Sequence, residues 1–196
     1  MDRTLLERWL EEVLATPGLT ALPDLEAARE RLAEDALRAA PLLDLAGGPV
    51  VDVGSGGGSP GIPLAIAAPH RPFTLLEAER RKAESLAVLA RDLPNVDVVW
   101  GRAELQPLER YGIALAKALA RPPIAAELTL PLVRAGGAAI LWVGETASRD
   151  RVARAAELAG GTLETEHDGL LVLRKVSATP PGLPRRPGMA KKRPLA

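Results

Sequence analysis

The sequence predicts an α/β fold built on one mostly parallel β-sheet, and three observations lead to it. From residue 49 onward, short β-rich runs alternate with helical runs. The first of these runs, PVVDV, leads directly into the glycine-rich segment GSGGGSPG at 54–61. The last two runs have no helix between them. Parallel strands need a crossover helix, whereas two runs joined by a tight turn form an antiparallel hairpin.

Residues 1–46 are predicted to form a helical segment in front of the sheet. Leucine, tryptophan and valine side chains recur at helical spacing between Leu5 and Leu14, and Pro17 ends that pattern. A second helix is expected over 26–40, with Asp24 in position to cap its first turn.

Residues 47–176 are predicted to form the sheet domain, with helices on both faces of the sheet. His167, Asp168 and Gly169 are expected to form the tight turn of the terminal hairpin. The expected strands are 49–53, 72–77, 96–100, 111–119, 136–143, 161–167 and 169–175, and the expected helices are 62–68, 79–93, 124–133 and 148–160. A hairpin after the fifth strand resembles the seven-stranded sheet of methyltransferases, whereas dinucleotide-binding sheets usually continue with helix-linked parallel strands.

Residues 177–196 are predicted to be a basic, extended arm. Their high proline content disfavours both helix and central strand. The arm carries five cationic side chains and no acid: Arg185, Arg186, Lys191, Lys192 and Arg193.

Composition narrows the possible functions. The chain has no cysteine, which excludes disulfides, thiolate metal sites and cysteine nucleophiles. It has no apolar run of the roughly 20 residues that span a bilayer, and its first 15 residues form an acidic amphipathic pattern, not an export signal. We therefore expect a cytoplasmic protein that does not enter a membrane.

The glycine-rich loop predicts a nucleotide-like ligand at the end of the first strand. Gly54, Gly56 and Gly58 supply backbone that can take positive φ or pass close to a ligand. A Walker-type phosphate loop is excluded because residues 50–69 contain no lysine. The remaining candidates are a nicotinamide dinucleotide and S-adenosylmethionine.

The register of the loop favours S-adenosylmethionine. Gly56, Gly58 and Gly61 do match the dinucleotide pattern GxGxxG, but the glycine that closes the strand is Gly54. Pro60 removes an N–H that a diphosphate would need, and Asp52 adds a carboxylate suited to the cationic methionine end of S-adenosylmethionine. Glu77, at the end of the second strand, is expected to accept hydrogen bonds from the ribose hydroxyls.

At the level of whole segments, the sequence resembles the small-subunit ribosomal RNA methyltransferase G family, also called glucose-inhibited division protein B. The similar segments are VVDVGSGGGSPGIPLAIAAP at 50–69, GRAEL at 101–105, YGIALAKALA at 111–120 with LTLPLVRAGG behind it, GLTALPDLEAARERLAEDAL at 18–37, and the ending ATPPGLPRRPGMAKKRPL at 178–195.

The resemblance implies a class I, Rossmann-like methyltransferase that transfers a methyl group from S-adenosylmethionine to N7 of a guanine in 16S ribosomal RNA. It implies cofactor contacts at Gly54, Ser59, Ala103, Glu104 and Lys117. Guanine N7 carries a lone pair, so catalysis is expected to rest on positioning without a general base or a metal, with Lys117 as the one candidate for a catalytic side chain.

The expected partner is 16S ribosomal RNA, free or in the small ribosomal subunit, bound by a monomer. Basic side chains that would contact RNA phosphates are Arg121, Arg185, Arg186, Lys191 and Lys192. His70 and His167, the only histidines, are expected to be solvated surface residues.

The chain departs from the family pattern at several polar positions: Gly18, Leu32, Ala36, Ser59, Gly112, Lys117 and Val143. Lysine at 117 keeps a charge but lacks the planar fork of arginine. Two alternatives therefore stay open: a divergent relative that binds S-adenosylmethionine but has another target or no activity, and, more remotely, an NAD-dependent oxidoreductase.

Overall fold

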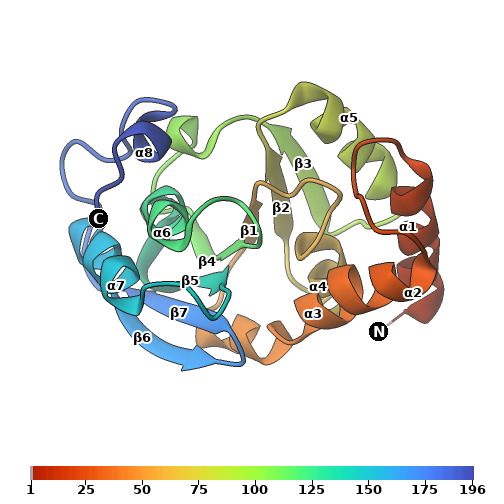
Figure 1. Cartoon of the computed structure of the whole chain (residues 1–196), viewed down its shortest axis with the longest axis horizontal. Coiled ribbons are helices and arrows are strands. Elements are labelled where there is room, and N and C mark those ends of the chain that lie inside the picture. Colours follow the sequence, from red (N-terminus) through yellow and green to blue (C-terminus); the bar gives the residue numbers. More distant parts are fainter. Residues whose placement is uncertain (1) are drawn as a thin grey trace.

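The computed structural model describes residues 2–196, which form one seven-stranded sheet in the order β3-β2-β1-β4-β5-β7-β6 (Figure 1). The strands are β1 (Val50–Val53), β2 (Phe73–Glu77), β3 (Val96–Trp100), β4 (Tyr111–Ala116), β5 (Val133–Trp142), β6 (Gly161–His167) and β7 (Leu170–Lys175). Strand β7 runs antiparallel to both of its neighbours, β5 and β6, and the other pairs of neighbouring strands are parallel. The predicted fold class and the predicted terminal hairpin are confirmed.

Helices cover both faces of the sheet, as predicted. The residues of β1 alternate between the two faces: Val51 packs in the hydrophobic core with α6 and α7, and Val50 packs with α4 on the opposite face. The bounds of these helices are α4 (Gly61–Ala67), α5 (Arg80–Leu89), α6 (Pro122–Thr129) and α7 (Arg149–Leu158). The first strand is therefore buried on both faces, which explains its continuous apolar sequence.

The N-terminal helices pack on the α4 and α5 side of the sheet. Helix α1 (Arg3–Ala15) begins at Asp2, whose carboxylate accepts from the N–H groups of Thr4 and Leu5. It buries the apolar stripe that the sequence predicted, including Trp9 and Val13, in a core shared with α4, α5 and β2. The first turn of the second helix is capped by Asp24, as predicted.

The helix expected over 26–40 has three parts. It comprises α2 (Leu25–Ala28), a π-helical turn (Arg29–Glu34) and α3 (Asp35–Leu37), and a 3₁₀ turn (Ala40–Leu45) follows. All three parts carry helix-forming residues, so their periodicity does not reveal the wider turn in the middle.

Other boundaries also differ from the prediction: β4 ends at Ala116 and not at residue 119, and α5 ends at Leu89 and not at residue 93. Helix α6 ends at Thr129, and β5 begins at Val133, after a short 3₁₀ turn that contains Pro131. Proline has no N–H to continue the helix, which accounts for the early end. The arm at 177–196 is not wholly extended: it contains the short helix α8 (Met189–Lys192), which lies beside α6 (Figure 1).

No helix within residues 2–196 is long and apolar enough to cross a membrane.

Candidate functional site

A cavity of about 430 Å³ lies at the carboxyl ends of β1, β2 and β4, where ligands of open α/β sheets bind. Its size falls within the range of about 300–1,000 Å³ that is typical of small-molecule sites. The glycine-rich loop, the ends of three neighbouring strands and the N-terminal helices form its wall. The wall includes seven of the eight predicted cofactor residues: Gly54, Gly56, Ser59, Glu77, Ala103, Glu104 and Lys117.

At Gly54 and Gly56 the glycine loop lines the cavity with backbone atoms and no side chain. Gly54 has φ +77°, and a Cβ added there would lie 2.5 Å from Cδ1 of Leu119, which also lines the cavity. Gly56 also has a positive φ, and its N–H donates to Oε2 of Glu77 over 2.9 Å. The positive φ therefore favours glycine at 54, and a larger residue there would also displace the Leu119 side chain.

Gly58, also predicted as a cofactor residue, does not line the cavity. A Cβ added there would meet Ile62 and the indole nitrogen of Trp9, so this glycine faces the N-terminal helix. Trp9 Nε1 donates to the carbonyl of Gly57 over 3.0 Å. The sequence placed Gly58 in the right loop, but its role is to let α1 support the loop from behind.

Glu77 lies at the end of β2 with its carboxylate at the cavity wall. Its two oxygens accept from the N–H groups of Gly56 and Glu79, at 2.9 and 2.8 Å. Each carboxylate oxygen can accept a further hydrogen bond. Glu77 is therefore oriented by backbone before any ligand arrives, and it retains acceptor capacity for a diol.

Asp52 does not reach the cavity, in contrast to the role expected from the sequence. Its carboxylate is buried beneath the loop, where Oδ2 accepts from the N–H of Gly61 over 3.1 Å and Oδ1 has no partner in the described chain. Burial raises the pKa of Asp52 to about 7, although the hydrogen bonds with Ser55 and Gly61 oppose that rise. Asp52 supports the start of α4 and does not line the cavity.

Another part of the wall comes from the short 3₁₀ turn Ala103–Leu105 after β3, of which Ala103 and Glu104 line the cavity. The side chain of Glu104 is 7% exposed. Its Oε1 accepts from the N–H of Gly188 over 3.0 Å and lies 3.3 Å from the Arg102 guanidinium. Burial opposes ionisation, but the hydrogen bonds from Gly188, Glu104's own backbone and Arg102 outweigh it and lower the pKa of Glu104. Glu104 is an ionised carboxylate that the C-terminal arm holds in place.

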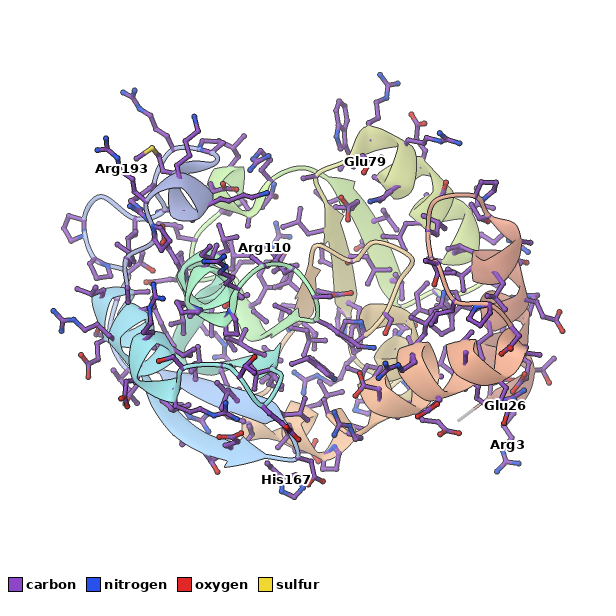
Figure 2. The ribbon with its side chains drawn as sticks, viewed as in Figure 1. Arg3, Glu26, Glu79, Arg110, His167 and Arg193 are labelled. Atoms are coloured by element: carbon purple, nitrogen blue, oxygen red, sulfur yellow. The ribbon has the colours of Figure 1, made fainter. Side chains whose placement is uncertain are left out.

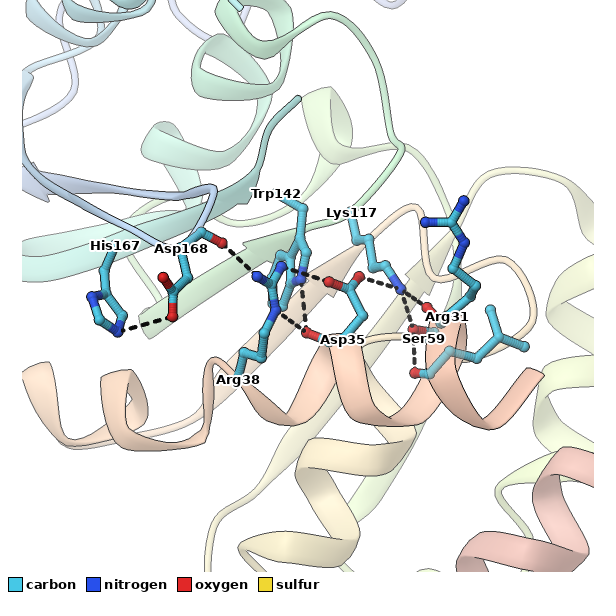
Figure 3. Close-up of polar contacts among 9 residues, drawn as sticks. Arg31, Asp35, Arg38, Ser59, Lys117, Trp142, His167 and Asp168 are labelled. Carbon is cyan, nitrogen blue, oxygen red and sulfur yellow. Dashed lines mark hydrogen bonds and ion pairs between the residues drawn. The ribbon is translucent and has the colours of Figure 1, made fainter. Parts of the chain in front are cut away.

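Lys117, just after β4, joins the cavity to the N-terminal helices (Figure 3). Its ammonium lies 2.9 Å from Oδ2 of Asp35 and 3.2 Å from Oγ of Ser59, and it also donates to the carbonyl of Arg31. Ser59 in turn donates to the carbonyl of Leu32 over 2.7 Å. The π-helical turn and α3 thus provide the acceptors that hold Lys117 at the wall of the cavity.

Three of the positions that depart from the family pattern meet in this network. Ser59 accepts a hydrogen bond from Lys117 and donates one to the backbone carbonyl of Leu32.

The other positions that depart from the family pattern lie outside this network. Val143 packs against the hydrophobic core. Gly112 lies where a Cβ would be 1.9 Å from the carbonyl oxygen of Gly47, so this backbone admits only glycine there. The remaining two positions do not line the cavity: Ala36 is a buried residue of α3, and Gly18 lies in a turn with φ +84°.

The predicted RNA-binding residues fall into two groups. Arg121, Arg186, Lys191 and Lys192 are exposed, and within residues 2–196 they form no ion pair with an acidic side chain. Arg185 instead makes a two-pronged ion pair with Glu127 of α6, with both N–O distances at 2.7 Å. Because its guanidinium is already paired within the protein, we do not propose Arg185 as an RNA contact.

Both histidines are exposed, as predicted, and neither lines the cavity. His167 was expected in the tight turn but is the last residue of β6, and it points away from the body of the molecule (Figure 2). No group of three His, Cys, Asp or Glu side chains that could hold a metal is found in residues 2–196.

Sequence reasoning missed several residues of the wall. Lys82 and Arg102 add cationic side chains to the rim, and Leu119 fills the space under Gly54. The N-terminal segment contributes Val13, Leu19 and Leu32. For Val13 the signal in the sequence was the apolar stripe between Leu5 and Leu14, which predicted a helix but no ligand site.

Comparisons with known proteins agree with this geometry. The family model described as rRNA small subunit methyltransferase G matches residues 4–167. A ribosomal RNA small subunit methyltransferase G from Syntrophomonas wolfei is 36% identical, with 98% of both chains covered. Its counterpart from Synechococcus sp. (strain JA-2-3B'a(2-13)) is 42% identical over 74% of this chain. The matched part spans only 63% of that Synechococcus protein.

Solved structures are similar in fold. The pyocyanin biosynthetic protein PhzM has a TM-score of 0.63 and 18% identity, with 81% of this chain and 60% of that chain covered. A 16S rRNA N2 methyltransferase from T. thermophilus, solved with AdoMet and guanosine, has a TM-score of 0.53 and 18% identity, with 69% and 37% covered. At these identities the similarity supports the fold alone.

Proposed function

The chain belongs to the rRNA small subunit methyltransferase G family, and from this premise we propose that it transfers a methyl group from S-adenosylmethionine to N7 of a guanine in 16S ribosomal RNA. The observation that carries the proposal is the cavity wall in which the backbone of Gly54 and Gly56 lies beside the carboxylate of Glu77.

The groups on this wall suit S-adenosylmethionine. Glu77 has acceptor capacity for two ribose hydroxyls, the N–H of Ala103 can meet the adenine edge, and Lys117 offers a cation to the methionine carboxylate. Val13, Leu19, Leu32 and Leu128 add apolar side chains to the wall. The sheet argues against the NAD-dependent alternative, because its strand order and its antiparallel strand β7 are those of methyltransferases.

When bound, S-adenosylmethionine supplies an electrophilic methyl group on its sulfonium. The protein's part is to hold the guanine so that N7 faces that methyl group, because N7 has a lone pair and loses no proton on attack. Correct alignment of two reactants is worth up to about 7–11 kcal/mol of the barrier. The absence of a histidine from the described cavity wall is compatible with this mechanism.

The exposed cations around the cavity would bind the RNA backbone. Arg121 begins α6 directly after the cavity segment 117–119, and Arg186, Lys191 and Lys192 lie on the arm beside the same helix. Phosphate contacts of this kind add affinity without reading sequence. A target in ribosomal RNA also implies that the protein works in the cytoplasm, and the folded unit described here would act as a monomer.

In a second candidate function, the protein binds S-adenosylmethionine but lacks the methyltransferase activity. The ammonium of Lys117 already has three partners, Asp35, Ser59 and the carbonyl of Arg31. If this network holds Lys117 away from the ligand, the protein would bind S-adenosylmethionine without transferring its methyl group to 16S RNA.

One experiment separates these candidates. The full chain is incubated with methyl-labelled S-adenosylmethionine and either naked 16S RNA or small ribosomal subunits, and calorimetry measures cofactor binding in parallel. The proposal expects label at N7 of a guanine in at least one substrate. Cofactor binding without label in either substrate would leave the second candidate, and absence of cofactor binding would contradict both.

A further inference from the structure

We infer that the C-terminal arm is part of the cofactor site: Arg185 anchors the arm so that Gly188 can hold Glu104 at the cavity wall, and neighbouring Arg186 has no such role. This inference rests on the proposed binding of S-adenosylmethionine in the cavity. It makes Arg185 and Gly188 positioning residues, since neither lines the cavity itself.

The first observation is the ion pair between the arm and α6. Glu127 has a side chain only 3% exposed, and both of its oxygens accept from the Arg185 guanidinium. Removing one partner of such a pair leaves a buried charge uncompensated, which is far more costly than loss of a surface pair. The buried carboxylate on α6 therefore fixes this part of the arm.

The second observation is the bond between the arm and the cavity wall. Three residues after Arg185, the N–H of Gly188 donates to Oε1 of Glu104, whose side chain lines the cavity. Gly188 has φ +81°, a left-handed conformation that glycine adopts without strain. The arm thus turns sharply at the point where its backbone reaches Glu104.

A third contact fixes the beginning of the arm. The buried ammonium of Lys175 at the end of β7 donates to the Thr179 hydroxyl and to the carbonyl of Ala159. The N–H of Thr179 donates to Glu109. The arm is therefore attached at both ends of its path, and the stretch between Thr179 and Gly188 is held by Arg185.

These contacts connect cofactor binding to arm docking. If the docked arm stabilises the wall that binds S-adenosylmethionine, then S-adenosylmethionine must stabilise the docked arm by the same factor. The exposed cations of the arm, among them Arg193, project into solvent (Figure 2), so RNA that binds them would act on an element shared with the cofactor site.

The chain offers a matched pair of variants to test this. Arg185→Ala and Arg186→Ala each remove one positive charge from adjacent positions of the arm, but only Arg185 holds Glu127. We expect Arg185→Ala to weaken S-adenosylmethionine binding about tenfold, within the usual range of coupling between sites. We expect Arg186→Ala to leave that affinity unchanged and to weaken RNA binding.

The readout distinguishes positioning from general destabilisation. Calorimetry is done at a temperature at which far-ultraviolet circular dichroism shows the variant to be folded. If folded Arg185→Ala binds S-adenosylmethionine as tightly as the wild type, the inference is wrong and Arg185 only stabilises the fold. If Arg186→Ala weakens cofactor binding equally, the weaker binding comes from the loss of a positive charge and not from the loss of the Arg185–Glu127 ion pair. The inference is then also wrong.

A measurement on the wild-type chain does not depend on any variant folding. Amide hydrogen exchange in a peptide covering 180–196 is followed with and without saturating S-adenosylmethionine. The inference expects slower exchange when the cofactor is bound, including at the N–H of Gly188. Unchanged exchange with the cofactor demonstrably bound overturns the inference alone, whereas failure of the wild type to bind the cofactor overturns the proposed function and the inference together.

Discussion

Lys117 after β4 and Asp35 on α3 form an ion pair of 2.9 Å across one wall of the cavity. The pair connects two segments that are far apart in sequence, the sheet and the N-terminal helices. Its side chains are 15% and 28% exposed, so solvent screens the attraction only in part. We therefore expect the pair to affect both the stability of the protein and the position of Lys117.

Replacing Asp35 tests that relationship. Asp35→Ala should lower the free energy of unfolding by about 1 kcal/mol, the upper end of the range for exposed pairs, because it removes the ion pairs of Asp35 with both Lys117 and Arg38. It should also change the affinity for S-adenosylmethionine, because Lys117 loses its charged partner. Urea unfolding and calorimetry measure the two effects. Glu34→Ala is the control, since Glu34 is exposed and has no ion pair in the described chain. Equal behaviour of the two variants would show that the pair is inert.

Gly54 provides a sharper test of the cofactor loop. Gly54→Ala should abolish S-adenosylmethionine binding, because the new Cβ would lie 2.5 Å from Leu119 in the cavity wall. It also places an L-residue at φ +77°, which by itself destabilises the fold.

Gly136→Ala separates the two effects of that substitution. Gly136 has a similar φ of +80°, but no described atom lies within 4 Å of an added Cβ, and the residue is not in the cavity wall. We expect thermal melting to show a loss of stability in both variants, and calorimetry to show loss of cofactor binding only in Gly54→Ala. Normal binding by folded Gly54→Ala would place the cofactor elsewhere.

The sequence was sufficient to predict the fold because its strongest signals are local. Continuous apolar strands, the glycine cluster after PVVDV and the turn at Asp168 each follow from neighbouring residues. The positions of Gly54 and Glu77 in the site could also be predicted, because both residues lie at the carboxyl ends of adjacent strands. Topology brings such ends together once the strand order is known.

The parts that could not be predicted depend on contacts between distant segments. The sequence shows Arg185 and Arg186 as equivalent cations, and only the position of Glu127 on α6 distinguishes them. Asp52 lies next to the loop in sequence, but packing turns its carboxylate under the loop toward Gly61. Gly58 likewise belongs to the loop and faces Trp9.

Asp52 makes stability depend on pH. Its pKa of about 7 in the folded state lies above the ordinary value of 3.8, mainly because burial disfavours the charged form. Between these values the folded state binds more protons than the unfolded state. The stabilisation is thus complete below pH 3.8 and is lost as the pH rises through about 7.

Asp52→Asn should remove this contribution while keeping an acceptor for the N–H of Gly61. The expected result is a variant that is more stable than the wild type at pH 8. The difference in unfolding free energy should change by up to about 1.4 kcal/mol per pH unit between roughly pH 4 and pH 7. Urea unfolding at several pH values measures it. A constant difference across that window would mean that Asp52 stays charged in the folded protein.

Lys191 and Lys192 test whether the arm binds RNA through its charge. Both are exposed and lie in the last turn of α8, where neither pairs with a described acid. Replacing both with alanine should weaken binding to 16S RNA and reduce the slope of log affinity against log salt by roughly 1.4–1.8, the contribution of two released counterions. Arg3→Ala is the control, because Arg3 lies at the opposite end of the molecule from the arm (Figure 2). Filter binding at several salt concentrations gives the slopes. An unchanged slope in the double variant, or an equal change in the Arg3 control, would assign RNA binding to another surface.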